Sequence, residues 1–180
     1  GRRGRHQVGS DEEVHGLFGL LEAAIRSETE ELRAQGVRVR LLGRLEELPD
    51  ATRRSIDEAL AATEEGTRLL LNIAFNYAGR TELVDAVRRI AASGTAPETI
   101  DEATISEALY TAGLPDPDLL IRTSGEQRIS NFLLWQCAYS ELVFLDTLWP
   151  DFREGHLYSA VAEFQARRRR MGAASVAALG

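Results

Sequence analysis

Apolar side chains recur at helical spacing near the start of the chain and predict a long first helix. Ser10 and Glu13 have the spacing of a capping box, in which each side chain accepts from the other residue's backbone N–H. The helix is therefore expected to begin after Ser10, and Gly36 provides a natural end. The apolar positions of the stretch are Val14, Leu17, Leu20, Leu21, Ala24 and Ile25.

The rest of the chain alternates between short apolar runs and amphipathic stretches, which is typical of an α/β fold. The run 69–75 is apolar on both sides of a pleat, as expected for a parallel strand that is covered on both faces. Further strands are expected at 37–42, 118–122 and 142–145, and helices at 49–65, 80–92, 105–112, 130–139 and 156–170. We therefore predict a single domain in which helices flank a mostly parallel β-sheet.

The domain is expected to run from residue 10 to residue 172. The length of 180 residues, 44% of them hydrophobic, suits one compact core. Residues 1–9 are rich in glycine and arginine without periodicity and predict an irregular segment, while 173–180 predict a C-terminal tail. About four strands can be counted, fewer than the usual ~5–6 of a sheet, so part of the fold before the first helix is expected to be missing.

Composition narrows the class of protein. No apolar run approaches the ~20 residues that cross a bilayer, and none follows the basic start as in a signal peptide, so a cytoplasmic location is expected. The net charge of −7 argues against general nucleic-acid binding, which needs a basic face. Cys137 is the lone cysteine and lies in an apolar run, which excludes a disulfide framework and predicts a core position.

Against this acidic background, Arg122 and Arg128 form a local basic cluster. Arg122 stands at the carboxyl end of an expected strand, where ligands bind in open α/β sheets. The following loop supplies Arg128 and then Ser130 as the N-cap of the next expected helix. A helix start with two guanidinium groups beside it would suit a phosphate or diphosphate. The alternative is that Ser130 is only a cap and that both arginines pair with Glu126 and other carboxylates.

The sequence around these arginines resembles that of the cis-prenyltransferases, the family that includes undecaprenyl diphosphate synthases. The segment DLLIRTSGEQRISNFLLWQCAYSEL at 118–142 is similar to the family's most diagnostic block over more than twenty consecutive positions. Further similar segments are LNI at 71–73, NYAGR at 76–80, LWPDF at 148–152 and RMG at 170–172, the last matching the family's Arg-X-Gly motif. The resemblance extends from about residue 10 to residue 172.

This resemblance implies an enzyme. A cis-prenyltransferase condenses isopentenyl diphosphate with an allylic diphosphate, farnesyl or geranyl, to give a Z-polyprenyl diphosphate such as the precursor of the undecaprenyl lipid carrier. By resemblance, Arg122, Arg128 and Ser130 hold the diphosphate of isopentenyl diphosphate and take part in catalysis. The family likeness also implies a homodimer, and it leaves room for peripheral contact with a membrane at product release.

Other positions receive roles from the same resemblance. Glu141 would help to hold Mg²⁺ between the bound diphosphates, although such a residue could also be a solvated carboxylate at a strand edge. Arg170 and Gly172 would reach the diphosphate site from the partner subunit, whereas the rest of the run Arg167 to Arg170 suits a solvated helix end. First-helix residues would line the tunnel that receives the growing prenyl chain, although they could equally be ordinary core. These residues are Leu17, Leu20, Leu21 and Ala24.

Two family motifs do not occur in this sequence. Family members carry an Asp-Gly-Asn-Gly-Arg-Trp segment, which supplies a Mg²⁺-binding aspartate and the cradle of the allylic diphosphate, and a Phe-Ser-X-Glu-Asn-Trp segment. Catalysis by this chain alone is therefore uncertain from the sequence. The first interpretation is a shortened version of a longer enzyme. The alternative is a non-catalytic accessory subunit that keeps the isopentenyl diphosphate site and the dimer surface.

Overall fold

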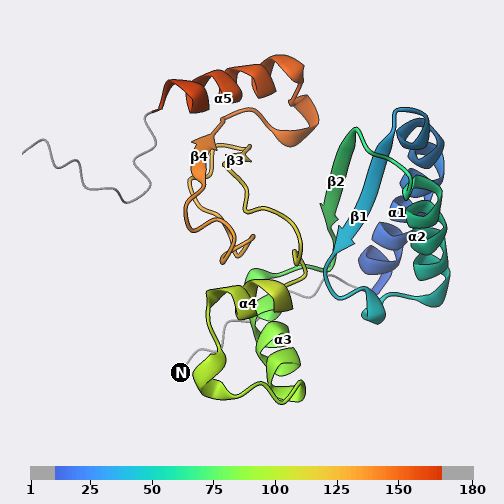
Figure 1. Cartoon of the computed structure of the whole chain (residues 1–180). Coiled ribbons are helices and arrows are strands. Elements are labelled where there is room, and N and C mark those ends of the chain that lie inside the picture. The colour runs from blue at the N-terminus through green and yellow to red at the C-terminus, as the bar shows by residue number, and fades with distance from the viewer. Residues whose placement is uncertain (1–10, 168–180) are drawn as a thin grey trace, which may run out of the picture. The chain divides into compact units, whose positions relative to one another are not determined.

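The computed structural model describes residues 11–167, without the side chains of residues 11–15, 17, 18, 21, 22 and 26. The chain forms two compact units, Gly1–Tyr77 and Ala78–Gly180. Each unit combines helices with parallel strands, which confirms the predicted α/β class (Figure 1). Within residues 11–167, no helix has both the length and the apolar character that a membrane span requires.

The first unit packs two helices against a pair of parallel strands. Strands β1 and β2 pair in register, with Val37 opposite Leu69 and Leu42 opposite Ala74. Helices α1 and α2 lie side by side and cover the same face of β1 (Figure 1). The elements of this unit are α1 (Asp11–Ala34), β1 (Val37–Leu42), the 3-10 helix Leu45–Glu47, α2 (Asp50–Thr63) and β2 (Leu69–Ala74).

The core of this unit lies between α2 and β1. Ile56 of α2 is 1% exposed, and Ala59 of α2 and Leu42 of β1 are buried as well. Thr63, also 1% exposed, donates from its hydroxyl to the carbonyl of Ala59 at 2.9 Å and accepts from the backbone N–H of Val39 at 3.2 Å. One hydroxyl thus ties the end of α2 to the middle of β1.

Strand β2 differs from the prediction in its burial. The expectation of a parallel strand is confirmed, but the expectation that both of its faces are covered is wrong. Leu69, Leu70 and Ile73 are 57%, 40% and 38% exposed. The physical reason is that the helix contacts of this unit, among the residues that the structure describes, fall mainly on β1 and leave β2 less covered.

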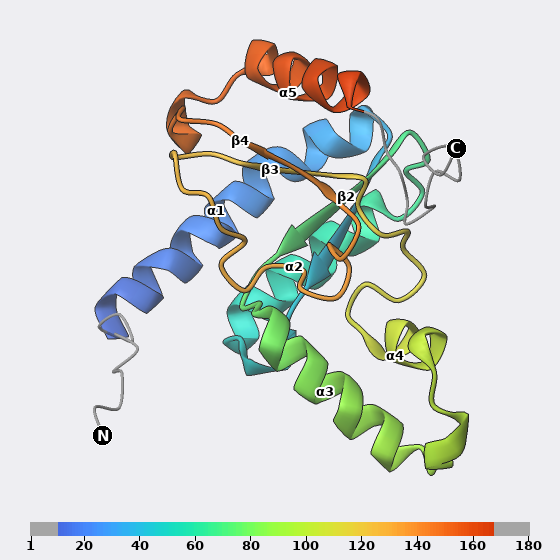
Figure 2. The same ribbon diagram turned by 90° about the vertical axis from the view of Figure 1, so that its left-hand side faces the viewer.

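The second unit contains a helical pair and a separate strand pair. Helices α3 and α4 lie side by side, and α5 contacts β4 (Figure 2). Strands β3 and β4 are parallel, with Leu119 opposite Glu141 and Arg122 opposite Phe144. Its elements are α3 (Gly79–Ala92), the 3-10 helix Pro97–Thr99, α4 (Glu102–Ala108), β3 (Leu119–Arg122), β4 (Glu141–Phe144), the 3-10 helix Trp149–Asp151 and α5 (Glu154–Ala166).

Helix α4 begins earlier in the sequence than its apolar positions predict. Asp101 is its N-cap, and its carboxylate accepts from the backbone N–H and the hydroxyl of Thr104 at 2.8 and 2.7 Å. These hydrogen bonds hold the pKa of Asp101 below its ordinary value. The cap shifts the helix from the predicted range 105–112 to Glu102–Ala108, because side-chain capping rather than hydrophobicity sets where this helix starts.

Cys137 is half-buried rather than fully inside the core. Burial raises the pKa of its thiol above the ordinary value, so the thiol stays uncharged at neutral pH. The predicted long helix at 156–170 is present as α5, which begins at Glu154 and ends at Ala166. The capping position Ser10 lies outside the described residues.

Candidate functional site

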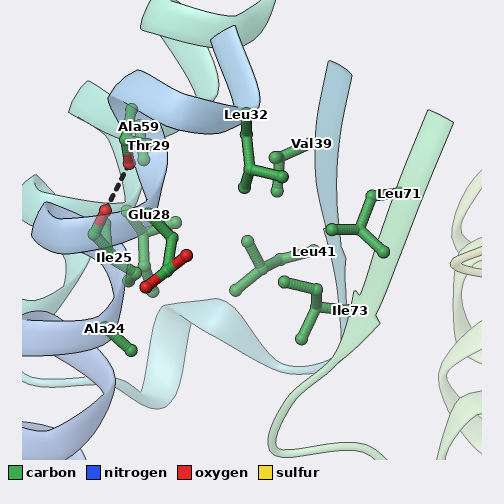
Figure 3. A pocket seen from close by; sticks show the side chains of 11 residues that line it. Ala24, Ile25, Glu28, Thr29, Leu32, Val39, Leu41, Ala59, Leu71 and Ile73 are labelled. Carbon is green, nitrogen blue, oxygen red and sulfur yellow. Dashed lines mark hydrogen bonds between the residues drawn. The ribbon is translucent and has the colours of Figure 1, made fainter. Parts of the chain in front are cut away.

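An apolar pocket of about 310 Å³ lies between α1 and the two strands of the first unit (Figure 3). Leu41 and Ile73 reach toward it from the strands, and Leu32 faces them from α1. Glu28 and Thr29 are the polar residues of a wall that is otherwise mostly apolar. The residues that line the pocket are Ala24, Ile25, Glu28, Thr29, Leu32, Val39, Leu41, Ile56, Ala59, Leu71 and Ile73.

Part of the predicted apolar stripe of the first helix lies at this pocket. Ala24 lines the pocket, whereas Leu20 is 71% exposed and is not among its lining residues. The side chains of Leu17 and Leu21 lie outside the described part of the structure. The pocket walls that face α1 come from β1 and β2, and the periodicity of the sequence did not predict that strand residues would line this pocket.

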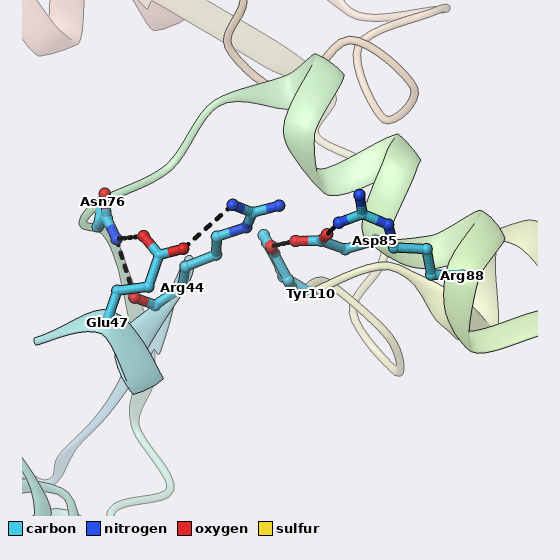
Figure 4. A network of polar contacts seen from close by, with 6 residues as sticks. All are labelled: Arg44, Glu47, Asn76, Asp85, Arg88 and Tyr110. Atoms are coloured by element: carbon cyan, nitrogen blue, oxygen red, sulfur yellow. Dashed lines mark hydrogen bonds and ion pairs between the residues drawn. The ribbon is translucent and has the colours of Figure 1, made fainter. Parts of the chain in front are cut away.

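The turn after β2 is fixed by close backbone approach and by an amide side chain (Figure 4). Gly43 has a φ of +142°, and a Cβ there would lie 1.9 Å from the carbonyl oxygen of Phe75. Asn76 donates from Nδ2 to the carbonyl of Arg44 at 2.9 Å and to Oε2 of Glu47 at 3.0 Å. Since Glu47 also pairs with Arg44 at 3.1 Å, Asn76 completes a local structural network.

In the second unit, Arg122 is the last residue of β3, at the edge where both parallel strands end. The loop that follows is held by backbone hydrogen bonds to the segment after β4. Ser124 N–H donates to the carbonyl of Thr147 at 2.8 Å, and Gly125 N–H donates to that of Leu145 at 2.9 Å. The loop therefore leaves the sheet in a fixed direction.

Two guanidinium groups converge on one hydroxyl in this loop. Arg122 donates from Nη1 to Ser130 Oγ at 2.7 Å, and Arg128 donates from Nε to the same oxygen at 3.2 Å. Arg122 Nη1 also donates to the backbone carbonyl of Arg128 at 2.5 Å. Glu126 bridges the pair, because each of its carboxylate oxygens accepts from one of the two arginines. The structure thus brings Arg122, Arg128 and Ser130 together.

The hydroxyl proton of Ser130 is not used in the hydrogen bonds to the two arginines. A hydroxyl offers two lone pairs and one proton, and both lone pairs here accept from guanidinium nitrogens. The proton must then point elsewhere, and no residue of the described range 11–167 is recorded as its acceptor. Ser130 is exposed, so this proton is available to an oxygen of a bound ligand.

The predicted helix at 130–139 does not form. Ser130, Asn131 and Leu133 have positive φ values of 45°, 63° and 44°, and the segment is a series of turns. Ser130 is therefore not the N-cap of an α-helix, and the expected contribution of a helix start to anion binding is wrong. The positive charge at this site comes from the two guanidinium groups.

The turns are held instead by the start of α3. Asn131 accepts from the Gly79 N–H through its backbone carbonyl at 2.7 Å and from the Arg80 N–H through Oδ1 at 2.9 Å. These bonds satisfy the first N–H groups of α3, whose N-cap Ala78 makes no side-chain cap. A Cβ at Gly79 would lie 2.9 Å from Leu134 Cγ, so only glycine permits this close approach without a shift.

A buried carboxylate anchors the far end of the same segment. Glu82 of α3 is 1% exposed and accepts from the Tyr110 N–H at 2.9 Å. It also accepts from Gln136 Nε2 at 3.2 and 3.1 Å, and that amide donates to Thr111 Oγ1 at 2.8 Å. The Tyr110 hydroxyl donates to Asp85, one turn further along α3 (Figure 4).

Sequence analysis gave Glu82 and Asn131 no role in the site, and it named Glu126 only in the alternative that both arginines pair with it, a pairing that the structure shows. An acidic residue in the first turn of a helix is ordinarily a solvated partner of the helix dipole, which conceals the burial of Glu82. The similarity block does contain Glu126 and Asn131, but it does not show what they contact.

Glu141, the predicted metal ligand, begins β4 and is paired with a cation. Arg167 donates from Nη1 to Glu141 Oε2 at 2.9 Å and also pairs with Glu163. The hydrogen bonds to Glu141 and then to Glu163 raise the pKa of Arg167 above its ordinary value. No group of three or more potential ligands for a metal occurs among the described residues. Glu141 offers one engaged carboxylate, so these residues do not by themselves fit a Mg²⁺ site.

Arg170 and Gly172, which are predicted to reach the diphosphate site from the partner subunit, lie outside the described residues 11–167.

Comparison with known proteins identifies the family. A family model described as "Putative undecaprenyl diphosphate synthase" matches residues 8–172. An isoprenyl transferase of Heliobacterium mobile is 49% identical over 169 residues, which cover 92% of this chain and 65% of that protein. A tritrans,polycis-undecaprenyl-diphosphate synthase (geranylgeranyl-diphosphate specific) of Methanopyrus kandleri is 48% identical over 167 residues, covering 89% of this chain and 62% of that protein. This chain thus spans less than two thirds of the length of these relatives.

Solved structures agree with the sequence relatives. The crystal structure of lavandulyl diphosphate synthase from Lavandula x intermedia, in complex with dimethylallyl diphosphate, has a TM-score of 0.87 at 37% identity and covers 92% of this chain and 74% of its own. A probable undecaprenyl diphosphate synthase from Campylobacter jejuni has a TM-score of 0.80 at 30% identity, with 91% and 76% covered. The converging arginines at the end of β3 are therefore found in a chain that belongs to the undecaprenyl diphosphate synthase family of cis-prenyltransferases.

Proposed function

We propose that this protein is a prenyltransferase that binds isopentenyl diphosphate at Arg122, Arg128 and Ser130 and joins it to an allylic diphosphate. The observation that carries the proposal is the convergence of two guanidinium groups on a hydroxyl whose proton is unused. Guanidinium groups and a hydroxyl donor match the oxygens of a diphosphate in charge and in hydrogen-bonding geometry. Family membership supplies the reaction class.

In the proposed reaction, bonds break and form in the two substrates, and the protein residues position the substrates and stabilise charge. The allylic C–O bond breaks and its electron pair leaves with diphosphate, a new C–C bond forms to the isopentenyl unit, and that unit loses a proton. The described residues fix the isopentenyl diphosphate by its charged end, which orients its double bond toward the allylic carbon. Their fixed positive charge also stabilises negative charge without reorganisation during the reaction.

The remaining parts of the proposal rest on the family likeness. The allylic substrate would be farnesyl or geranyl diphosphate, and the product a Z-polyprenyl diphosphate. The active form would be a homodimer in which Arg170 and Gly172 reach the partner's diphosphate site. Mg²⁺ would be held between the bound diphosphates and neutralise part of their charge, and Glu141 would contribute one oxygen ligand on leaving its pair with Arg167. The protein would act in the cytoplasm, with peripheral membrane contact at product release.

The apolar pocket beside α1 is proposed to receive the growing prenyl chain. Its volume of about 310 Å³ lies at the lower end of the roughly 300–1,000 Å³ of small-molecule pockets. A mostly apolar wall suits a hydrocarbon, because transfer of apolar surface out of water is the main source of its binding free energy. Ala24 lies on this wall and is small, which leaves space open at that point.

Ala24→Phe is expected to shorten the product by one or more isoprene units. The added ring would enter the pocket from α1 and remove space from the chain. Ala23→Phe is the matched control, because Ala23 is an exposed neighbour on the same helix that does not line the pocket. Chain lengths are measured by chromatography of the labelled products after dephosphorylation. An unchanged length distribution in Ala24→Phe would show that the chain lies elsewhere.

The activity itself is tested with the purified protein, MgCl₂, labelled isopentenyl diphosphate and farnesyl or geranyl diphosphate. Incorporation of label into products longer than the allylic substrate is expected. Binding of isopentenyl diphosphate without any extension would instead support the accessory-subunit alternative. The ion pair of Glu141 with Arg167 is the observation that favours this alternative. If the protein shows neither binding of isopentenyl diphosphate nor chain extension, both the proposed site and the proposed activity are overturned.

A further inference from the structure

The carboxylate of Glu126 lies where an anionic ligand of the two arginines would be expected. Arg122 donates to one of its oxygens and Arg128 donates to the other, both through Nη2. The side chain of Glu126 is 42% exposed, so it is not locked in place by packing. A single carboxylate therefore uses the guanidinium donors that point away from Ser130.

The chain thus supplies its own anion to the cluster. Two guanidinium groups and one carboxylate leave a single net positive charge among these side chains. A carboxylate tethered in the same loop acts at a high effective concentration. A free monoanion that accepts from the same guanidinium groups therefore cannot readily replace it. A diphosphate carries more charge and more acceptor oxygens than a carboxylate, so it can bind the two arginines strongly enough to displace the Glu126 carboxylate.

We infer that Glu126 is an internal competitor of the diphosphate, occupying both guanidinium groups until a diphosphate displaces it and so setting the affinity of the site. This inference rests on the proposed function, because it concerns the same arginines. It adds a specificity-determining residue, since Glu126 excludes weak anions from the cluster and admits a diphosphate.

Glu126 could also preorganise the two guanidinium groups, but other hydrogen bonds within the loop orient them as well. Without the carboxylate, Arg122 still donates to Ser130 Oγ at 2.7 Å and to the carbonyl of Arg128 at 2.5 Å. Arg128 still donates from Nε to Ser130 at 3.2 Å. The guanidinium groups therefore keep most of their orientation when Glu126 is neutral, while the repulsion between its carboxylate and the incoming diphosphate is removed.

Glu126→Gln is expected to bind inorganic pyrophosphate about tenfold more tightly than the unmodified protein, since a neutral amide no longer repels or competes with the anion. The dissociation constant is measured by isothermal titration calorimetry at one fixed ionic strength, because salt screens such interactions. Glu98→Gln is the matched control, as it removes the same charge from an exposed position on the 3-10 helix Pro97–Thr99 and should leave the affinity unchanged.

A second variant guards against an effect peculiar to glutamine. Glu126→Ala removes the side-chain oxygens entirely and is expected to bind pyrophosphate more tightly as well. Tighter binding by both variants supports the inference, whereas equal or weaker binding by both overturns it and leaves the diphosphate site intact. If only Glu126→Gln binds more tightly, release of a competitor is also overturned. Loss of measurable binding in the unmodified protein and in every variant overturns the proposed site, and the inference with it.

Discussion

Arg122→Ala is expected to weaken the binding of inorganic pyrophosphate by about ten- to hundredfold, and to raise the KM for isopentenyl diphosphate while lowering kcat. Arg122 donates to Ser130, to the Arg128 carbonyl and to Glu126, and its side chain is 22% exposed. Its removal takes away a direct charged donor, together with the hydrogen bonds that tie the end of β3 to Ser130 and to the Arg128 carbonyl. Hydrogen bonds to charged groups contribute about 1.5–3 kcal/mol, which gives the expected range.

The measurement is calorimetric titration with pyrophosphate, followed by steady-state kinetics. Arg33→Ala serves as control, because Arg33 is an exposed arginine of α1 whose recorded ion pair is with Glu30 on the same helix. Arg122→Lys keeps the charge but not the planar fork, so an intermediate affinity is expected. Kinetics of Arg122→Ala that match those of the unmodified protein would remove this residue from the site.

Glu82→Ala is expected to lower the free energy of unfolding of the second unit by about 2–4 kcal/mol. The substitution would leave the Tyr110 N–H and the Gln136 amide without their buried acceptor, and it would open a cavity. Because Gln136 lies in the segment that also carries Ser130, pyrophosphate affinity should fall together with stability. This effect is indirect, since Glu82 acts through the loop and not on the ligand.

Urea unfolding followed by tryptophan fluorescence is the suitable measurement, because both tryptophans, Trp135 and Trp149, belong to the second unit. Trp135 also donates from its indole nitrogen to Ser106 Oγ at 3.0 Å, so it reports on the segment that Glu82 anchors. Val84→Ala is the control, since Val84 is a 48% exposed neighbour on α3. Similar unfolding midpoints for the two variants would contradict the proposed anchor.

Periodicity and turn residues were sufficient to predict several elements. The expected strand at 37–42 matches β1, and the expected helices at 49–65 and 80–92 match α2 and α3 within two residues at each end. These elements are set by local signals, such as an apolar face and a glycine or proline at the boundary. The meeting of Arg122 with Arg128 follows from their places at a strand end and in the next loop.

The segment 130–139 shows why other features were not predictable. Its apolar run has the composition of a buried helix, yet its backbone is set by contacts with α3 that are distant in the sequence. Three residues of the segment have positive φ values, which no local sequence pattern indicates. The pairing of Glu126 with both arginines was one of two interpretations that the sequence left open, since a carboxylate between two arginines could also have faced solvent.

The bond between Asn131 and the start of α3 also limits how this sequence can change during evolution. Arg80 and Asn131 are separated by 51 positions, yet the backbone of one is satisfied by the side chain of the other. Insertions or deletions between them are tolerable wherever the connecting segments can absorb them. A residue larger than glycine at position 79, in contrast, requires a compensating change near Leu134 or Asn131, so these distant positions should vary together or remain fixed.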